Sequence, residues 1–393
     1  MDKGYGRTLS ASYLGYVSQA IINNLAPLLF VIFRNTFGLS LSQIGFLVTY
    51  NFCMQIFVDL LAARFAERIG YKKCIVAAHF FCAAGLVCLG VLPRVMPDPY
   101  LGLLTAITVY SAGGALIEVL VSPIVEALPL DGKSGAMSLL HSFYCWGHAL
   151  VVVLSTLFLS RFGADSWPLL AALWAVVPFG NAFLYMASPV LTLRQTQERM
   201  PMKKLFRVRI FWLFVVLMIC SGASEQAMGQ WSSYFAETGL GVGKTLGDLL
   251  GPCMFAVLMG TARVVYSAVS NRISLKQVLI ASGLLCIISY LTAVAAPHPV
   301  LRLIGCALTG LSVGVMWPGV FSTASQRYPQ GATTMFALLA LAGDVGCASG
   351  PSLVGLVSDL LGGDLRFGIL AALVFPTVLV MGIFFLGKKK NSR

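Results

Sequence analysis

The chain of 393 residues is 58% hydrophobic and only 11% charged, with a mean hydropathy of +0.84. Soluble proteins are about half apolar and about a quarter charged, so this composition excludes a water-soluble enzyme or binding protein. The formal charge of +12 would suit a nucleic-acid partner, but basic loops on one side of a membrane give the same excess. Composition therefore predicts a chain embedded in a lipid bilayer, with no nucleic-acid partner.

Apolar segments of about 20 residues, the length that crosses a bilayer as a helix, recur along the whole chain. We expect such spans near residues 8–33, 43–66, 73–93, 99–124, 136–159, 166–188, 208–236, 246–269, 276–296, 300–325, 333–361 and 366–387. They predict an all-α membrane protein with twelve transmembrane helices and only short loops between them.

The basic residues are distributed unequally between the two sides of the predicted membrane. Of the 27 Lys and Arg residues, 20 fall on the side that holds the N-terminus, 6 on the other, and Arg263 lies within a span. We call the first side the basic side. Because cytoplasmic loops of membrane proteins carry the Lys and Arg excess, both termini are predicted to be cytoplasmic in a multi-pass protein of the inner or plasma membrane.

Motifs for metal, cofactor or nucleotide chemistry are missing from the sequence. The ten cysteines lie singly in apolar stretches, without C-x-x-C spacing or a neighbouring His, and are interpreted as core residues. Gly241 to Thr245 resembles the end of a phosphate-binding loop but lacks the upstream glycine spacing. We therefore expect no metal, no cofactor and no ATP-driven step, and a monomeric chain.

An internal repeat divides the chain into two halves. The loop at residues 67–73, after the second span, corresponds to residues 271–277, after the eighth, and Leu128-Pro129 corresponds to Tyr328-Pro329. The repeat predicts two pseudo-symmetric six-helix bundles, at residues 1–188 and 210–393. Residues 189–209, rich in Lys, Arg, Gln and Thr, are predicted to be the cytoplasmic linker between them.

The loop at residues 64–73, R-F-A-E-R-I-G-Y-K-K, resembles the acidic-Arg-x-Gly-x-basic-basic signature of the major facilitator superfamily. The resemblance covers nearly the whole chain, although Ala63 stands where the family has Gly and Glu67 where Asp is usual. It implies that Glu67 and Arg68 make cytoplasmic gate contacts. The alternative is a solvated loop that only sets topology.

Two further segments are similar to the fucose and glucose/galactose permease branch of that superfamily, which contains sugar:proton symporters. They are the glycine-rich Gly113 to Glu118 and the stretch Met137 to His141. The fucose permease has an Asp in helix 1, where this chain has Gln19, Asn23 and Asn24. Proton coupling through a helix 1 acid is therefore not carried over.

The seventh span is the most polar, because Ser, Gln and Glu side chains wrap more than half of it between Ser221 and Ser233. Such a face must line a cavity or pack on polar neighbours. Amides and a carboxylate beside an indole ring suit a sugar, whereas the alternative is polar glue between helices. Predicted substrate contacts are Gln19, Asn23, Asn24, Glu118, Glu225, Gln226, Gln230, Trp231 and Trp317.

Ionisable residues inside apolar spans are costly and usually functional. Glu118 and Glu225, with no basic residue near either in sequence, are the predicted proton-coupling groups. Asp59, Arg263 and Asp344 are predicted gate residues together with Glu67 and Arg68. A helix break is expected at Gly343 to Gly346, and a kink at Trp317-Pro318.

The sequence thus favours a secondary active transporter that moves a small polar solute, a sugar or polyol, by alternating access with proton symport. The alternative within the same fold is a proton-coupled efflux carrier for an amphipathic drug or metabolite. A membrane-embedded enzyme would need a cluster with catalytic or ligand spacing, and a receptor would need a signalling domain. Neither is expected from this sequence.

Overall fold

The computed structural model describes residues 3–129, 133–191, 205–269, 273–327 and 332–386. The first half contains α1 (Lys3–Leu28), α2 (Phe30–Phe37), α3 (Leu41–Ile69), α4 (Tyr71–Val95), α5 (Pro99–Ala127), α6 (Lys133–Phe162), η1 (Ala164–Ser166) and α7 (Trp167–Met186). The second half contains α9 (Arg209–Gly229), α10 (Ser232–Tyr234), η2 (Phe235–Gly239), α11 (Lys244–Asp248), η3 (Leu249–Cys253), α12 (Met254–Val269), α13 (Leu275–Ala295), α14 (Pro299–Val313), α15 (Met316–Arg327), α16 (Ala332–Leu360), α17 (Leu365–Ala371) and α18 (Val374–Phe385).

Within these ranges, 11 helices are long and apolar enough to cross a membrane, and the bent pair α1 and α2 raises the number to as many as 12. That pair bends by 47° just after Pro27, whose ring cannot continue the helical hydrogen-bond ladder. The prediction of an all-helical membrane protein with twelve spans is confirmed.

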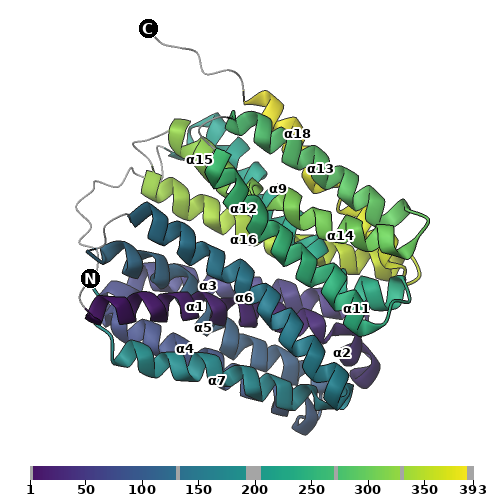
Figure 1. Cartoon of the computed structure of the whole chain (residues 1–393), viewed down its shortest axis with the longest axis horizontal. Helices are drawn as coiled ribbons and strands as arrows, with labels where there is room; N and C mark the ends of the chain where they lie inside the picture. The colour runs from purple at the N-terminus through teal and green to yellow at the C-terminus, as the bar shows by residue number, and fades with distance from the viewer. Residues whose placement is uncertain (1–2, 130–132, 192–204, 270–272, 328–331, 387–393) are drawn as a thin grey trace.

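The helices form two groups (Figure 1). In the first, α1, α3, α4, α5, α6 and α7 contact each other, and in the second α9, α12, α13, α14, α16 and α18 do so. The groups meet chiefly where α3 lies against α16 and where α6 lies against α12. The boundary at residues 189–209 remains a proposal, since residues 192–204 lie outside the described part of the chain.

Glycines bring helices of one group into close contact. A Cβ at Gly113 of α5 would lie 2.4 Å from the carbonyl oxygen of Ala78 in α4, and one at Gly346 of α16 would lie 2.1 Å from that of Ile219 in α9. Small residues at such crossings let backbones approach, which is how helices associate in a bilayer without a hydrophobic driving force.

The predicted break at Gly343 to Gly346 is wrong, because α16 runs without interruption from Ala332 to Leu360. Its glycines serve close packing: a Cβ at Gly343 would lie 2.2 Å from the Trp317 ring. The helix is interrupted just before the predicted kink at Trp317-Pro318, since α14 ends at Val313 and α15 begins at Met316, but the two parts together form one span.

Polar side chains cap several helices on the side opposite the basic side. Ser40 and Gln43 form a capping box at the start of α3, and Asp98 accepts a hydrogen bond from the backbone N–H of Tyr100 in α5. Asp364 caps α17, and hydrogen bonds from the Arg366 side chain lower the pKa of its carboxyl group. These caps fix where the spans begin.

We predict that Gly346→Ala destabilises the protein, because the new methyl group would overlap the backbone of α9 and no side-chain rotation could relieve it. Overpacking of this kind costs roughly 1 to 3 kcal/mol. Gly180→Ala on α7 is the matched control, since its Cβ would have no atom within 4 Å. Thermal unfolding in detergent should show a lower midpoint for Gly346→Ala only, and equal midpoints would refute the close helix contact.

Candidate functional site

A cavity of about 790 Å³ lies between the two groups of helices. Its lining comes from α1, α3, α5 and α6 on one side and from α9, α12, α15 and α16 on the other, mostly in their halves toward the basic side. The predicted site residues that line it are Gln19, Asn23, Glu118, Glu225, Gln226, Arg263, Trp317 and Asp344. The cavity is therefore built from both halves of the chain.

In the first half, Glu118 is held by amide side chains. Glu118 is exposed to the cavity, and its Oε2 accepts a hydrogen bond of 2.9 Å from Nε2 of the buried Gln19. The same Nε2 lies 3.4 Å from Oε1 of Gln55, whose own Nε2 donates to Oδ1 of Asn23 over 2.9 Å. Gln55 lies on α3 and was not singled out in the sequence.

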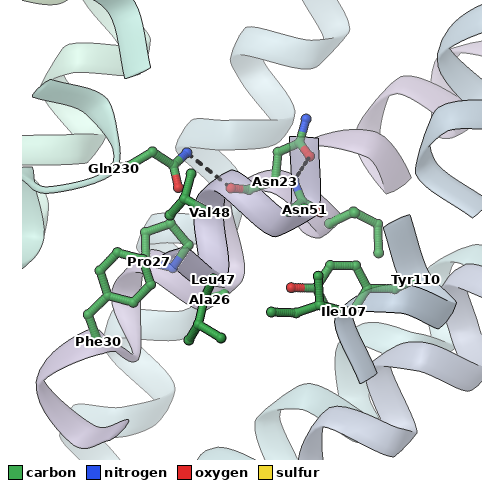
Figure 2. A pocket seen from close by; sticks show the side chains of 11 residues that line it. Asn23, Ala26, Pro27, Phe30, Leu47, Val48, Asn51, Ile107, Tyr110 and Gln230 are labelled. Atoms are coloured by element: carbon green, nitrogen blue, oxygen red, sulfur yellow. Dashed lines mark hydrogen bonds between the residues drawn. The ribbon is translucent and has the colours of Figure 1, made fainter. Parts of the chain in front are cut away.

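In the second half, the chain of amides continues to Glu225. Gln230 donates from Nε2 to Oε1 of Gln226 over 2.8 Å, and Gln226 donates to Oε1 of Glu225 over 3.3 Å. Gln230 also donates to the backbone carbonyl oxygen of Asn23 over 3.2 Å (Figure 2). That carbonyl is free because its helical partner would be the N–H of residue 27, which is Pro27.

The two carboxyl groups are thus joined by one hydrogen-bonded series of amides that passes from one half of the chain to the other. Asn23 stands at its centre, since its side chain accepts from Gln55 and its carbonyl oxygen accepts from Gln230. Amide N–H groups do not relay protons under ordinary conditions. The series therefore positions the carboxyl groups, and three of its members, Gln19, Asn23 and Gln226, form the floor of the cavity.

Behind this floor lies a second, small pocket of about 20 Å³, which is room for about one water molecule. Asn23 lines both this pocket and the large cavity, whereas Gln230 lines only the small one (Figure 2). Asn51 of α3 also lines the small pocket and donates to Oδ1 of Asn23 over 3.3 Å. Asn23 therefore lies between the small pocket and the large cavity.

Aromatic side chains form much of the cavity wall, and sequence reasoning identified only Trp317 among them. Tyr16 of α1 and Tyr144 of α6 line the first half, where their hydroxyl groups lie within hydrogen-bond distance of Ser122 and Asn24. Phe321, four residues after Trp317, lines the second half. Their spacing resembles that of any helix core, so the sequence carried no signal for these rings.

The predicted gate residues are not joined as ion pairs in the described part of the chain. Arg263 lines the cavity and donates from Nε to the carbonyl oxygen of Gly314, at the break between α14 and α15. Asp344 lines the cavity and is 9% exposed, whereas Asp59 has a buried Oδ1 that accepts no hydrogen bond there. The ion pairs that the structure does show lie elsewhere.

Other predicted residues lie outside the cavity lining. Trp231 is fully buried and donates from Nε1 to the carbonyl oxygen of Pro351, and Asn24 donates to the carbonyl oxygen of Ala20. Arg68 is exposed at the end of α3. The side chain of Glu67 is outside the described residues.

On the side opposite the basic side, the two halves are held together by a buried carboxylate that sequence reasoning missed. Asp248 of α11 is 1% exposed and accepts hydrogen bonds from Ser233 and, over 2.9 Å, from Thr156 of α6. Lys244 lies 3.1 Å from Asp248 and donates to the carbonyl oxygen of Leu28 at the end of α1. We call Lys244, Asp248 and Thr156 the latch.

Further contacts close the same side. Asp359 of α16 accepts hydrogen bonds from the backbone N–H groups of Leu41 and Ser42 at the start of α3, over 3.0 and 2.6 Å. Thr49 of α3 donates to the carbonyl oxygen of Ala348 in α16 over 3.1 Å. The cavity is thus closed at this side while its lining extends toward the basic side.

We predict that Asp248→Asn loosens the closed side, because it removes a buried charge that Lys244 and Thr156 depend on. Breaking one partner of a buried ion pair costs roughly 3 to 5 kcal/mol. A single cysteine introduced as Val48→Cys into a cysteine-free background, in the small pocket, reports access from that side. A membrane-impermeant thiol reagent should label this cysteine at least several-fold faster in the protein that carries Asp248→Asn than in the protein that keeps Asp248.

The matched control is Asp98→Asn. Asp98 is an exposed helix cap on the same side, and its hydrogen bond from Tyr100 stays within the start of α5. It should leave the labelling rate unchanged. If Asp248→Asn also leaves the rate unchanged, the latch does not hold the closed side.

Comparison with known proteins gives one matching family model and several similar structures. The model described as Major Facilitator Superfamily matches residues 12–351 and 253–393. The membrane protein MosC of Rhizobium meliloti is 22% identical over 330 residues, which are 84% of this chain and 78% of that protein.

The solved structures that are similar over nearly their whole length include a Spinster homologue and a fucose:proton symporter. A bacterial homologue of the human lysosomal transporter Spinster, in an inward-facing and occupied conformation, has a TM-score of 0.79 at 14% identity and covers 98% of this chain and 97% of its own. A variant of the E. coli fucose:proton symporter FucP has a TM-score of 0.67 at 19% identity and covers 98% and 100%. At these identities the likeness shows a shared fold.

Proposed function

This chain belongs to the Major Facilitator Superfamily and is a secondary transporter, and we propose that it moves a small hydroxylated solute, a sugar or polyol, coupled to protons. The observation that carries the proposal is the cavity between the two halves, whose floor is a layer of amides and whose wall is rich in aromatic rings.

The lining has the chemistry that a hydroxylated solute requires. The side chains of Gln19, Asn23 and Gln226 each offer an amide N–H or carbonyl group at or beside the cavity floor. Hydroxyl groups leave water only when their hydrogen bonds are replaced, and amides both donate and accept. The rings of Tyr144 and Trp317 offer flat apolar surfaces for the C–H faces of such a solute.

The volume is also suited to a small solute. Sites for small molecules measure roughly 300 to 1,000 Å³, and this cavity of about 790 Å³ lies in that range. A solute that fills part of it would leave room for water on the open side. The name of one similar structure, a fucose:proton symporter, is in keeping with a sugar and a proton as cargo.

Glu118 and Glu225 are the proposed proton sites. Both line the cavity, one from each half of the chain, and each accepts an amide hydrogen bond from a residue that also lines it. A carboxyl group that changes between the two open states from a wet to a dry environment takes up or releases a proton. Solute and proton would thus share one set of contacts.

The direction of access follows from the proposed topology. If the basic side is cytoplasmic, as the Lys and Arg distribution predicts, both termini are cytoplasmic and this conformation faces the cytoplasm. Alternating access then requires the latch to open and the two helix groups to come together on the basic side.

The second candidate is an efflux carrier for an amphipathic molecule. It is favoured by the aromatic share of the lining, which includes Tyr16, Phe52 and Phe321 beside Tyr144 and Trp317. The two candidates differ in the compounds that should compete for the cavity. Sugars and polyols should compete under the first, and flat apolar cations or acids under the second.

We predict that Asn23→Ala and Gln226→Ala each weaken solute binding roughly five- to a hundred-fold, because removing one partner of a buried polar contact costs about 1 to 3 kcal/mol. Binding is measured with purified protein against a panel of sugars and polyols. Asn35→Ala and Gln277→Ala, exposed residues of the same types, should bind as the parent does. Unchanged affinity in both test variants would move the solute site away from the amide floor.

We predict that Glu118→Gln and Glu225→Gln abolish proton-driven accumulation in proteoliposomes but retain exchange of solute between equal concentrations. The reason is that a glutamine keeps the size and hydrogen bonds of the carboxyl group and cannot bind the coupling proton. Glu126→Gln, exposed near the end of α5, is the control and should accumulate solute normally. Normal accumulation by both test variants would refute proton coupling through these residues.

A further inference from the structure

The charges in the cavity are unbalanced. Its lining contains three carboxyl groups, those of Glu118, Glu225 and Asp344, against one guanidinium, that of Arg263, and one imidazole, that of His141. Proton coupling would account for Glu118 and Glu225 but not for Asp344, and each charge is costly to keep inside a membrane protein. The excess of carboxyl groups in the lining therefore favours a positively charged ligand.

The guanidinium serves only part of the cavity. Arg263 lies within electrostatic range of Glu225, Tyr144 and Tyr16. Asp344 is within electrostatic range of Glu118 and Asp59 instead, all three of which are acidic. Glu118 lies within electrostatic range of Glu225 as well, so the carboxyl groups form one acidic cluster, and Arg263 acts on the end of it that contains Glu225.

Asp344 is the least satisfied carboxyl group of the cavity lining. It is only 9% exposed and faces the cavity, and among the described residues it forms neither a hydrogen bond nor an ion pair. Glu118, by contrast, accepts a hydrogen bond from Gln19. A carboxyl group that is nine-tenths buried and unpartnered costs free energy unless a ligand or a proton neutralises it.

An aromatic ring packs on the residue that precedes Asp344 in α16. Trp317 lines the same cavity, and its ring packs so closely on Gly343, the residue before Asp344, that a Cβ there would lie 2.2 Å from it. An ammonium group that binds a carboxylate close to an indole ring gains an ion pair, and it gains a cation–π contact as well where it reaches the face of the ring. Hydroxyl groups alone gain neither.

We propose that Asp344, Glu118 and Trp317 form a subsite for a cationic amine, so that the transported solute is an amine-bearing hydroxylated compound of the amino-sugar or amino-polyol class. This inference rests on the proposed function, because the amide floor would hold the hydroxyl groups of the same solute. The amine would lie toward α16, and the ring or chain of the solute would lie over Asn23 and Gln226.

The subsite also gives the solute a part in closing the cavity. Glu118 belongs to the first half of the chain and Asp344 to the second, so their like charges oppose the approach of the two halves. An ammonium group between them replaces repulsion with attraction on both sides. The loaded carrier would therefore close toward the basic side more readily than the empty one.

The test compares matched pairs of solutes that differ by one group: a hexosamine with the parent hexose and with its N-acetyl form, and an amino-cyclitol with the parent cyclitol. Binding is measured at neutral pH with the purified full chain. In the parent protein, the amine member of at least one pair should bind roughly ten-fold or more tightly than both neutral members. Asp344→Asn should bring that ratio close to one while changing the affinity for the neutral members less than about two-fold.

Control variants separate charge from folding. Asp165→Asn, an exposed carboxylate in η1, should keep the preference for the amine. Asp344→Glu should restore part of it. If Asp344→Asn does not fold, Trp317→Phe and Trp317→Leu replace it, with the preference for the amine retained by Phe and reduced by Leu.

The outcomes distinguish this inference from the proposed function. Equal binding of amine and neutral members by the parent protein overturns the amine subsite and leaves the sugar or polyol proposal standing. A preference for the amine that survives Asp344→Asn overturns the role of Asp344. If sodium ions increase the affinity for the neutral members, and this increase is lost in Asp344→Asn, the subsite binds an inorganic cation and the inference is overturned. Binding of no member of any pair refutes both proposals.

Discussion

The hydrogen bond from Gln230 to the backbone carbonyl of Asn23 is the interaction on which the cavity depends. Pro27 creates the acceptor by leaving that carbonyl without its helical partner, and the other half of the chain supplies the donor. An unpaired carbonyl in a membrane interior is costly, so the contact favours the two halves being together at this level. The same residue, Asn23, also holds Gln55 through its side chain. One proline thus links the bend of a helix to the floor of the cavity.

The floor and the latch both close the side opposite the basic side, but with different kinds of contact. The floor consists of neutral amides, whereas the latch contains an ion pair between the partly exposed Lys244 and the buried Asp248. Neutral amide contacts suit a layer that must rearrange with every cycle, since each is worth only about 0.5 to 1.5 kcal/mol net. The ion pair lies within one half and offers Thr156 of the other half a fixed acceptor.

The sequence was sufficient to predict the fold, because span length and the signature loop each depend on local composition. It also identified eight cavity residues, since ionisable and amide side chains in apolar spans have few other roles. It did not identify Gln55 or Asp248, whose importance depends on contacts with residues far away in the chain. Trp231 shows the opposite error, since a tryptophan beside polar residues looks the same in sequence whether it faces a cavity or a core. The continuous α16 likewise shows that glycine pairs indicate close packing as readily as a break.

Because of the hydrogen bonds from Leu41 and Ser42 to Asp359, the closed side tolerates most substitutions at these two positions. Both donors are backbone N–H groups at the first turn of α3, where the helix has no internal partner for them and its dipole favours a negative charge. Replacing either side chain leaves the bond intact unless proline is introduced. Drift at the start of α3 can therefore change the surface of the protein without changing how firmly this side closes. Asp359 is the single position through which this contact can be tuned.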